Sequence, residues 1–375
     1  MLSFQVNSRH AQSLKELQST FSIKYAALST LNPAELDFIH RYARISMIGA
    51  STRIENAILT DSEISWMDTI LTGDGKTSAF QMHRQQIEAK LSKDRERSIE
   101  EVAGCRAMLS LIYEQAHEML PLTESQIRGL HSELLRYYKE SDHYRGQYKR
   151  NSNSVVEHDR TTGKQKDVFR TADPGPFTKA AMTDLVEWYN RTLIEEPWNI
   201  AVASEFVFRF LAIHPFQDGN GRLGRGLFLL CLLQCPDQHI SFVSKYLAID
   251  RQIEKCKEEY YLVLQRCSDG KYQNDPKQYR IEIFLQFMIK ILNEAFKDID
   301  HNRRQFRAFR ELSPSAHVVL ESFKNKPEIR LKTSDLVSET KLPRRTISNA
   351  LEKLIEEEFI QKYGQGAGVR YQLIF

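Results

Sequence analysis

The sequence predicts a mainly α-helical protein with one β-hairpin in its body and a small α+β module at its C-terminal end. Three observations lead to this prediction. Most of the chain places apolar residues at helical spacing, one polar stretch lacks this periodicity, and residues 313–375 follow a new pattern of short elements. At 375 residues, the chain is long enough for two or three domains.

Composition and charge narrow the class of protein. Charged residues make up 27% and hydrophobic residues 41% of the chain, which is typical of a globular protein and excludes a disordered or fibrous one. The net charge, 52 − 49 = +3, is too small to dominate binding to nucleic acid or to an anionic membrane, so any basic site must be local. No apolar run approaches the roughly eighteen residues of a membrane helix, and no signal peptide is evident. We therefore expect a cytoplasmic protein without a membrane partner.

The helices of the body are predicted from their apolar periodicity. Asn32-Pro33 is typical of a helix start, because Asn can cap the helix and Pro suits its first position, and apolar residues continue at helical spacing toward Ser51. The same spacing predicts further helices at residues 99–116, 125–138, 177–193, 200–212, 223–233, 252–265 and 279–296.

One stretch of the body breaks the helical pattern. Residues 146–169 are polar, include the turn-like pair Thr162-Gly163 and lack helical periodicity, so they form either a hairpin or a long loop. Further on, near residues 298–304, apolar spacing gives way to charge, and a new pattern begins after Ser313-Pro314. This change predicts a domain boundary.

The C-terminal module, residues 313–375, combines three short helical patterns with a final alternating segment. The helices are expected at residues 316–323, 333–339 and 344–357, and the alternating segment surrounds Gly364, Gly366 and Gly368. Three helices followed by a glycine-tipped hairpin resemble a winged helix-turn-helix.

The most informative stretch is HPFQDGNGRLGR, from His214 to Arg225, between two predicted helices. Its Gly-Asn-Gly segment at a helix entry can turn successive backbone N–H groups toward one anion, and the helix dipole favours negative charge there. Arg222 and Arg225 lie three residues apart on the same helix face, where their guanidinium groups can bind more than one phosphate. The sequence therefore predicts a polyphosphate site.

Two further side chains of this stretch have catalytic chemistry. Asp218 offers a hard oxygen ligand for Mg²⁺, which usually completes its coordination with substrate phosphates. His214 offers a base whose ordinary pKa is near neutrality. His214 and Asp218 could alternatively bind a transition metal, but no third ligand is evident nearby.

The stretch matches every fixed position of the signature HxFx(D/E)GNGRxxR, and the chain thereby resembles the Fic family. Residues 122–131 and the segment that begins at Gly146 also resemble family landmarks. The resemblance implies a Fic-type helical bundle with a β-hairpin flap, which we place at residues 96–300. It also implies an enzyme, a protein adenylyltransferase that transfers AMP from ATP to a hydroxyl side chain of a target protein.

The resemblance implies a role for each residue of the motif. His214 would take the proton from the attacking hydroxyl, Asp218 would hold Mg²⁺ between the α- and β-phosphates, and Arg225 would reach the γ-phosphate. The remaining positions would cradle the phosphates: Gly219, Asn220, Gly221 and Arg222. The flap, with Lys149 and Arg150 at its start, would bind an extended target segment by strand addition, unless it is an ordinary surface hairpin.

An upstream segment, Ser51 to Asn56, matches the family's inhibitory pattern (S/T)xxxE(G/N). On a helix, Ser51 and Glu55 share a face. In the resembling proteins this glutamate pairs with the second arginine of the motif, here Arg225, so that ATP binds unproductively. The N-terminal helical region, residues 1–95, would then inhibit the enzyme from within the same chain. The alternative interpretation is an ordinary surface glutamate.

The last predicted helix of the C-terminal module has an outward face suited to DNA. A buried stripe that includes Ile347 leaves four other side chains outward, and these can contact phosphates and base edges: Arg344, Arg345, Ser348 and Asn349. Ten Lys/Arg against eight Asp/Glu give this module a net charge of only +2. The module could instead contact a second copy of the chain, as a homodimer, or the target protein.

Other functions remain open at this point. The protein could be a DNA-bound regulator whose Fic core only senses nucleotide, although His214 and Asp218 argue against this because a sensor needs neither a base nor a placed metal. It could also transfer another nucleoside monophosphate, or remove AMP at the same site.

Overall fold

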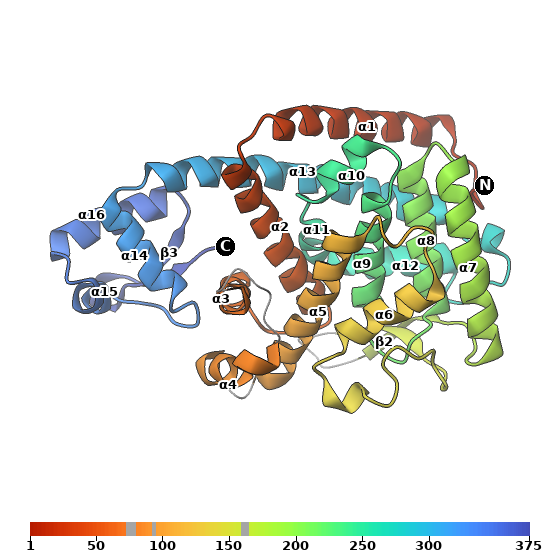
Figure 1. Ribbon diagram of the computed structural model, residues 1–375, viewed down its shortest axis with the longest axis horizontal. Coiled ribbons are helices and arrows are strands. Elements are labelled where there is room, and N and C mark those ends of the chain that lie inside the picture. Colours follow the sequence, from red (N-terminus) through yellow and green to blue (C-terminus); the bar gives the residue numbers. More distant parts are fainter. Residues whose placement is uncertain (73–79, 92–94, 159–164) are drawn as a thin grey trace.

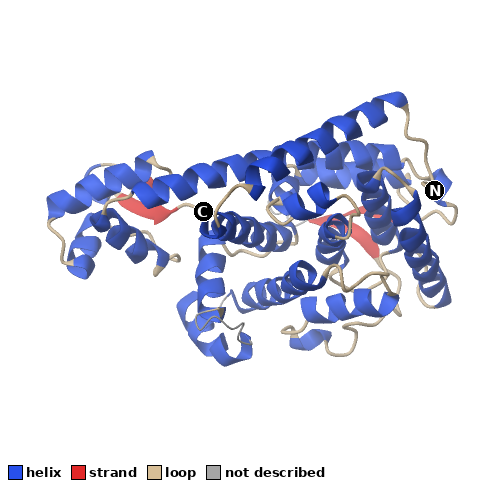
Figure 2. Ribbon diagram, turned by 45° about the horizontal axis from the view of Figure 1, so that its top comes forward, coloured by secondary structure: helices blue, strands red, loops and turns tan. Residues whose placement is uncertain are grey.

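The computed structural model describes residues 1–72, 80–91, 95–158 and 165–375. Helices dominate this part of the chain, and its two small sheets are antiparallel hairpins (Figure 2). The helices and strands are, in chain order, α1 (Ser8–Ser29), α2 (Pro33–Ile54), α3 (Asp61–Leu71), α4 (Phe80–Leu91), α5 (Glu96–Gln115), α6 (Glu124–Leu134), β1 (Ser154–His158), β2 (Gln165–Arg170), α7 (Pro176–Glu195), α8 (Asn199–Ile213), α9 (Asn220–Leu233), α10 (Gln238–Ser244), α11 (Ile249–Lys255), α12 (Lys257–Ser268), α13 (Ile281–Glu311), α14 (Pro314–Lys324), α15 (Thr333–Thr340), α16 (Arg344–Glu356), β3 (Ile360–Tyr363) and β4 (Arg370–Leu373).

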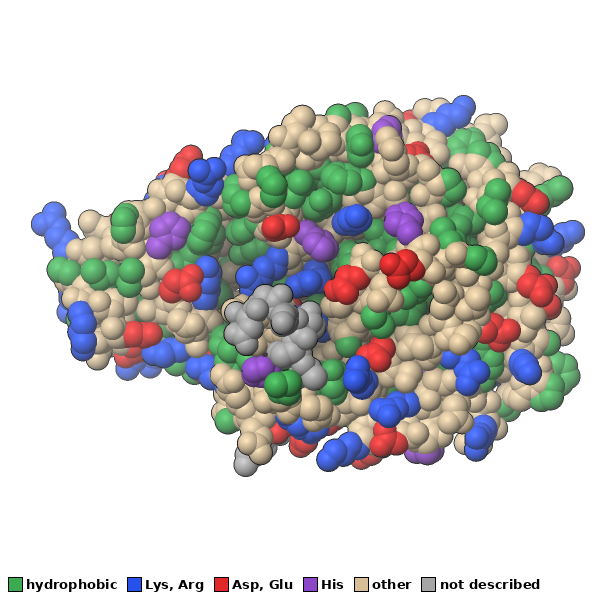
Figure 3. All heavy atoms as spheres, in the orientation of Figure 1, with side chains coloured by type: hydrophobic (Ala, Val, Ile, Leu, Met, Phe, Trp, Pro, Cys, Tyr) green, Lys and Arg blue, Asp and Glu red, His purple; other side chains and the backbone are tan. Residues whose placement is uncertain are grey.

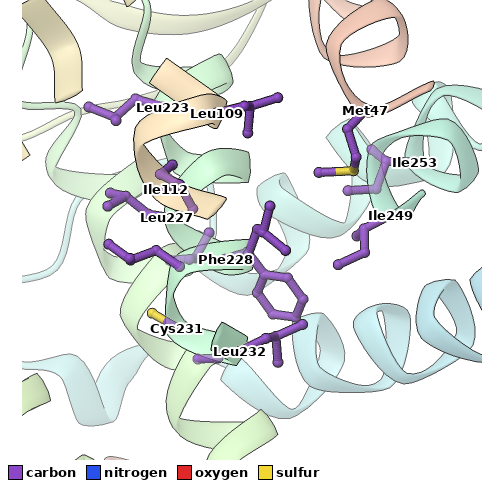
Figure 4. Packing of buried hydrophobic residues seen from close by; sticks show 14 of the residues in the cluster. Met47, Leu109, Ile112, Leu223, Leu227, Phe228, Cys231, Leu232, Ile249 and Ile253 are labelled. Atoms are coloured by element: carbon purple, nitrogen blue, oxygen red, sulfur yellow. The ribbon is translucent and has the colours of Figure 1, made fainter. Parts of the chain in front are cut away.

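The core of the body surrounds α9. This helix is apolar on nearly all sides, as a fully enclosed helix must be, and α5, α8 and α10 pack against it (Figure 1). Leu109 of α5 lies near Leu223 of α9, while Met47 of α2 lies beside Ile249 and Ile253 of α11 (Figure 4). None of the described helices is both long and apolar enough to cross a membrane.

The helix α2 begins where the sequence predicted. The side chain of Asn32 accepts a hydrogen bond from the backbone N–H of Glu35 at 3.0 Å, and Pro33 is the first helical residue. The second half of α2 is buried against α5, α11 and α13, and its C-terminal end points toward α9. Burial therefore fixes the position of the residues that follow Ser51.

The predicted helix at 279–296 was too short. Helix α13 continues through residues 298–304 to Glu311, because polar residues of this segment are buried on the inner face of the same helix. Asp298 accepts a hydrogen bond from Gln252 at 2.6 Å, and Asn302 is buried. The charged side chains of this segment belong largely to the outer face of the same helix. The predicted helix at 252–265 is instead two helices, α11 and α12, separated at Cys256.

The polar stretch after Gly146 forms a hairpin. Strands β1 and β2 are antiparallel, with Ser154 opposite Arg170 and a register shift between Val155 and Val156. The predicted turn at Thr162-Gly163 lies outside the described residues. The hairpin stands beside the C-terminal end of α8, at the side of the body where α9 begins.

The C-terminal segment has its own hydrophobic cluster, formed by the three helices α14, α15 and α16 and the antiparallel pair of β3 and β4. Ile347, Leu351 and Leu354 form the buried stripe of α16, as the sequence predicted. The segment also contacts the body: the ring of Phe375 stacks on Tyr42 of α2, with ring centroids 4.5 Å apart.

Gly104 of α5 lies directly against the C-terminal end of α6. A Cβ at this position would lie 1.9 Å from the carbonyl oxygen of Leu134, which is backbone and cannot move away easily. We expect Gly104→Ala to lower the free energy of unfolding by about 1–3 kcal/mol, measured by urea denaturation. Gly129→Ala is the matched control, because nothing lies within 4 Å of the added carbon, and a small gain from helix propensity is expected. Equal effects of the two changes would contradict the close packing.

Candidate active site

A pocket of about 210 Å³ lies where the end of α2, the loop between α8 and α9, the strand β1 and the helix α12 meet. The sequence-predicted residues Glu55, His214 and Asp218 line it. So do the other motif positions predicted to bind phosphates: Gly219, Asn220, Gly221, Arg222 and Arg225. The fold thus gathers on one cavity sequence-predicted residues that are up to 170 positions apart in the chain.

His214 stands at the C-terminal end of α8 in the left-handed conformation, with φ of 52°. Its ring Nδ1 lies 3.2 Å from the carbonyl oxygen of Leu211, which can only accept, so Nδ1 carries the hydrogen. Nε2 then keeps a lone pair. Burial, together with the charge of Lys149, lowers the pKa of His214 to about 4. The imidazole is therefore neutral at physiological pH and able to accept a proton.

The loop before α9 is closed by Asn220. Its side chain accepts a hydrogen bond from the backbone N–H of Phe216 at 2.9 Å and donates one to the carbonyl of Phe216 at 2.7 Å. Gly219 precedes it with φ of 80°, a conformation that favours glycine. The side chain of Asn220 is thus engaged within the loop, and only backbone N–H groups at the start of α9 are left for an anion.

Asp218 fits a metal ion that arrives with a phosphate ligand. Its carboxylate is 40% exposed, and one oxygen accepts hydrogen bonds from the backbone N–H of Gly219 at 2.6 Å and from Arg222 at 3.4 Å. Within the described ranges, no group of three or more His, Cys, Asp or Glu side chains could hold a metal. A Mg²⁺ ion here would need phosphate and water oxygens as its other ligands, which is its usual coordination.

The two arginines of the motif are buried and incompletely paired. Among the residues that the structure describes, Nε and Nη1 of Arg222 and Nη1 of Arg225 have no hydrogen-bond partner. Both side chains are only 2–3% exposed. The nearest carboxylate oxygen to Nη1 of Arg222 in an ion pair belongs to Glu101, at 3.8 Å, which is too far for a hydrogen bond. Burying charged donors without hydrogen bonds is costly, so these groups indicate an anionic ligand for the pocket.

The end of α2 meets Arg225, as the inhibitory pattern predicted. A carboxylate oxygen of Glu55 accepts a hydrogen bond from Nη2 of Arg225 at 3.0 Å. Ser51 accepts two more, through its hydroxyl from Nε at 3.1 Å and through its carbonyl from Nη2 at 2.8 Å. A Cβ at Gly221 would lie 2.4 Å from the Glu55 carboxylate, so the glycine makes room for this approach. Asn56 follows with φ of 76°, and its side chain accepts from Lys257.

A known protein family matches the part of the chain that contains the motif. Residues 121–232 match the profile of the Fic/DOC family. This segment is a Fic/DOC family domain. Such domains generally transfer AMP or another nucleoside monophosphate, and their proteins are generally transferases that act on nucleotide and protein substrates. No curated protein sequence matches the chain.

Solved structures of Fic proteins have the same fold. A Fic family protein from Desulfovibrio desulfuricans G20 is 22% identical with a TM-score of 0.54, covering 100% of this chain and 98% of its own. A Fic domain containing signaling protein from Bacteroides thetaiotaomicron VPI-5482 is 24% identical with a TM-score of 0.53, covering 77% of this chain and 97% of its own. Fic-1 from C. elegans, residues 134–508, is 16% identical with a TM-score of 0.53, covering 79% and 73%.

His131 contacts the motif loop through a hydrogen bond and a ring stack. Its Nδ1 accepts a hydrogen bond from the backbone N–H of Gly146 at 2.8 Å, so Nε2 carries the hydrogen and donates to the carbonyl of Asp218 at 2.9 Å. Its ring stacks on Phe216 with centroids 3.9 Å apart. Burial lowers the pKa of His131 to about 4, which keeps this neutral tautomer. His131 thereby joins the motif loop to the start of the flap.

Asp250 is a pocket neighbour that no sequence pattern marked. It is 1% exposed on α11, and one carboxylate oxygen lies 3.6 Å from Nε of Arg225. Burial raises the pKa of Asp250 to about 6, although the charge of Arg225 opposes this shift. Arg225 therefore has a second acidic neighbour besides Glu55. From α12, Tyr260 and Tyr261 complete the wall of the pocket.

The four candidate DNA contacts lie apart from the pocket of the Fic domain, on α16. Arg344, Arg345 and Asn349 are exposed, whereas Ser348 is half-buried and donates to the carbonyl of Arg344 at 3.1 Å. The structure therefore divides the predicted site residues into two sets. One set lines the pocket in the body or, as Ser51 and Asn56 do, lies within four residues of Glu55 at the end of α2, and the other lies on the C-terminal segment.

Proposed function

We propose that this protein is an adenylyltransferase that moves AMP from ATP to a hydroxyl side chain of a target protein. The observation that carries the proposal is the combination, in one pocket, of a neutral His214 with two buried arginines, each of which keeps at least one N–H group without a hydrogen bond among the described residues. A base and a polyphosphate site side by side are the two parts that nucleotidyl transfer to a hydroxyl requires.

The proposed reaction assigns each of these groups a role. Nε2 of His214 takes the proton of the target hydroxyl, and the hydroxyl oxygen bonds to the α-phosphorus. The bond from the α-phosphorus to the oxygen that bridges to the β-phosphate breaks, and pyrophosphate leaves. Arg222, Arg225 and the backbone N–H groups at the start of α9 bind phosphate oxygens and orient the triphosphate. Mg²⁺ held by Asp218 would offset the negative charge that develops on the leaving group.

In this proposal the flap hairpin binds the target protein. Ser154 and Val155 of β1 line the pocket together with His214. An extended target segment that pairs with this hairpin would present its hydroxyl above the base. Because this pairing uses backbone groups, it depends little on the side chains of the target.

Glu55 is the proposed inhibitor of the enzyme. Its hydrogen bond to Nη2 of Arg225 occupies a guanidinium edge that faces the pocket, where we place the γ-phosphate. A triphosphate would have to bind with its γ-phosphate elsewhere, which would misalign the α-phosphate. Residues 1–95 would thus form an inhibitory region before a catalytic domain at 96–300.

The position of a radioactive label tests the proposed reaction. Protein incubated with ATP labelled at the α-phosphate should become labelled, whereas ATP labelled at the γ-phosphate should leave no label, with Glu55→Gly tested beside the parent protein. Label from the γ-phosphate would indicate phosphoryl transfer instead. Absence of label from either position, in both proteins, would favour a nucleotide sensor.

We also propose that residues 313–375 form a winged helix-turn-helix domain that binds DNA. The support is the order of three helices and a hairpin, with Arg344 and Arg345 exposed in the first turn of α16. Acidic and basic side chains are interspersed over the face shown in Figure 3, so a DNA contact would have to be local.

DNA binding by the full chain should be weak and strongly dependent on salt. We expect a mixed-sequence duplex to bind at about 50 mM salt, and Arg344→Ala with Arg345→Ala to reduce the slope of log K against log salt by about 2. Lys353→Ala is the control, because this lysine lies at the other end of α16 and pairs with Glu357 at 2.6 Å. No binding at low salt, or equal slopes for all variants, would favour contacts with protein.

A further inference from the structure

Lys149 is a buried lysine at the base of the flap hairpin. Its side chain is almost fully enclosed, and the residue is 2% exposed. The ammonium nitrogen donates to the side-chain oxygen of Asn153 at 2.8 Å, to the hydroxyl of Thr171 at 2.9 Å and to the carbonyl of Ile213 at 3.0 Å. An ammonium group has three N–H donors, so every one of them has an acceptor.

This lysine is buried without an acidic partner. Among the described residues, no carboxylate oxygen lies within 4.0 Å of its nitrogen, and Asp173 acts on it only from a greater distance. Lysine is rarely enclosed in this way, because desolvation of the charge is costly. Burial lowers the pKa of Lys149 to about 8, so the group is still mainly charged at neutral pH. The three neutral acceptors must therefore be arranged to hold it.

Lys149 holds the chain on both sides of His214. Its ammonium binds the carbonyl of Ile213, the residue before His214, and its own backbone N–H binds the carbonyl of Pro215, the residue after it, at 2.8 Å. These two hydrogen bonds from Lys149 hold His214 in its left-handed backbone conformation. This conformation is unfavourable for any residue that has a Cβ atom.

The same group joins the two sides of the hairpin. Asn153 precedes β1 and Thr171 follows β2, and the hydroxyl of Thr171 lies 2.8 Å from the carbonyl oxygen of Asn153. The amide of Asn153 donates to the carbonyl of Phe216 at 2.8 Å. The base of the flap and the backbone of residues 213–216 are therefore one hydrogen-bonded unit with the ammonium of Lys149 at its centre.

We propose that Lys149 is a positioning residue that sets the distance between His214 and a target segment bound on the flap. This proposal rests on the proposed adenylyl transfer. The flap would bind the target segment that carries the attacking hydroxyl, and His214 is the base. A rigid connection between the flap and His214 therefore keeps the hydroxyl and the base at a fixed distance. A loose connection would leave ATP binding intact and misplace the hydroxyl.

Lys149→Met tests this role in the Glu55→Gly protein. We expect self-labelling from α-labelled ATP, at saturating ATP, to fall about ten- to a hundredfold, while the dissociation constant for ATP stays unchanged because Arg222 and Arg225 are untouched. Lys179→Met is the matched control, since Lys179 is an exposed lysine on α7 away from the pocket, and this variant should label normally. An unchanged rate in Lys149→Met, or a parallel loss of ATP affinity, would overturn the proposal.

The pH profile separates positioning from a merely structural role. His214 and Asp173 are the titratable groups that face the ammonium. Above about pH 8 the neutral amine has one donor fewer, so labelling should decline in the parent and persist in Lys149→Arg, whose guanidinium does not titrate there. If the two proteins decline alike at alkaline pH, Lys149 is not the group responsible and the proposal fails.

Two further measurements test the proposal if a variant does not fold or transfers no label. If Lys149→Met does not fold, Asn153→Ala should show the same loss of rate with unchanged ATP affinity, because it cuts the bond to the carbonyl of Phe216. If Glu55→Gly transfers no label at all, adenylyl transfer itself is wrong, and nitrogen NMR of His214 then tests Lys149 alone. A single Nδ1–H tautomer in the parent should become a mixture in Lys149→Met, and an unchanged tautomer would refute the positioning role.

Discussion

Glu55→Gly is expected to raise adenylyl transfer by about ten- to a hundredfold. The change removes the carboxylate that accepts a hydrogen bond from Nη2 of Arg225 at 3.0 Å, and so frees that guanidinium edge for the γ-phosphate. A charge-assisted hydrogen bond of this kind contributes about 1–3 kcal/mol, which corresponds to the stated range of rates. The measurement is the initial rate of label transfer from α-labelled ATP at saturating Mg²⁺ and ATP.

The Arg225→Ala variant is the control for this mechanism. It lacks the group that Glu55 withholds, so adding Glu55→Gly should give no gain, and the double variant should behave like Arg225→Ala alone. Ser51 and Asp250 remain as partners of Arg225 in Glu55→Gly, so the guanidinium should stay in place. If the Glu55→Gly protein is no more active than its parent, the segment from Ser51 to Asn56 is an ordinary helix end without an inhibitory role.

His214→Ala is expected to lower the rate of transfer by about a hundred- to ten-thousandfold, the usual contribution of a general base. The nucleotide should still bind, because the arginine donors and the start of α9 do not depend on the imidazole. The rate should be measured in the Glu55→Gly protein, where the starting activity is highest, and ATP affinity by calorimetry in the same samples.

Acid pH gives a second check on His214. Its pKa is lowered to about 4 by burial and by the charge of Lys149, and the neutral form is the base. Activity should therefore persist below the ordinary histidine pKa of about 6.5 and fall as the pH approaches 4. Undiminished labelling by His214→Ala would show that His214 is not the base of the reaction.

Local sequence patterns were sufficient to predict much of this fold and to mark the motif residues that line the candidate pocket. Asn32-Pro33 predicts the start of α2 because a helix cap depends only on adjacent residues. The motif from His214 to Arg225 is contiguous, so the loop closed by Asn220 before the start of α9 follows from neighbouring positions. The apolar stripe of α16 was predicted for the same reason.

Contacts between distant segments decided the rest. Helix α13 runs past Asp298 because Gln252, on another helix, binds that carboxylate in the interior, and periodicity alone treats such polar positions as exposed. Asp250 reaches Arg225 only through the packing of α11 against α2. Neither partner can be inferred from the spacing of residues along one element.

Lys149 and Arg150 illustrate the limit most directly. As neighbours in sequence they are two similar basic residues at the start of a polar stretch, and either could face solvent. The carbonyls of residues 213–216, more than sixty positions away, accept hydrogen bonds from one side of the hairpin base, so Lys149 is buried and Arg150 is exposed. Burying a charged group is unfavourable unless hydrogen-bond acceptors surround it. These acceptors come together only in the folded chain.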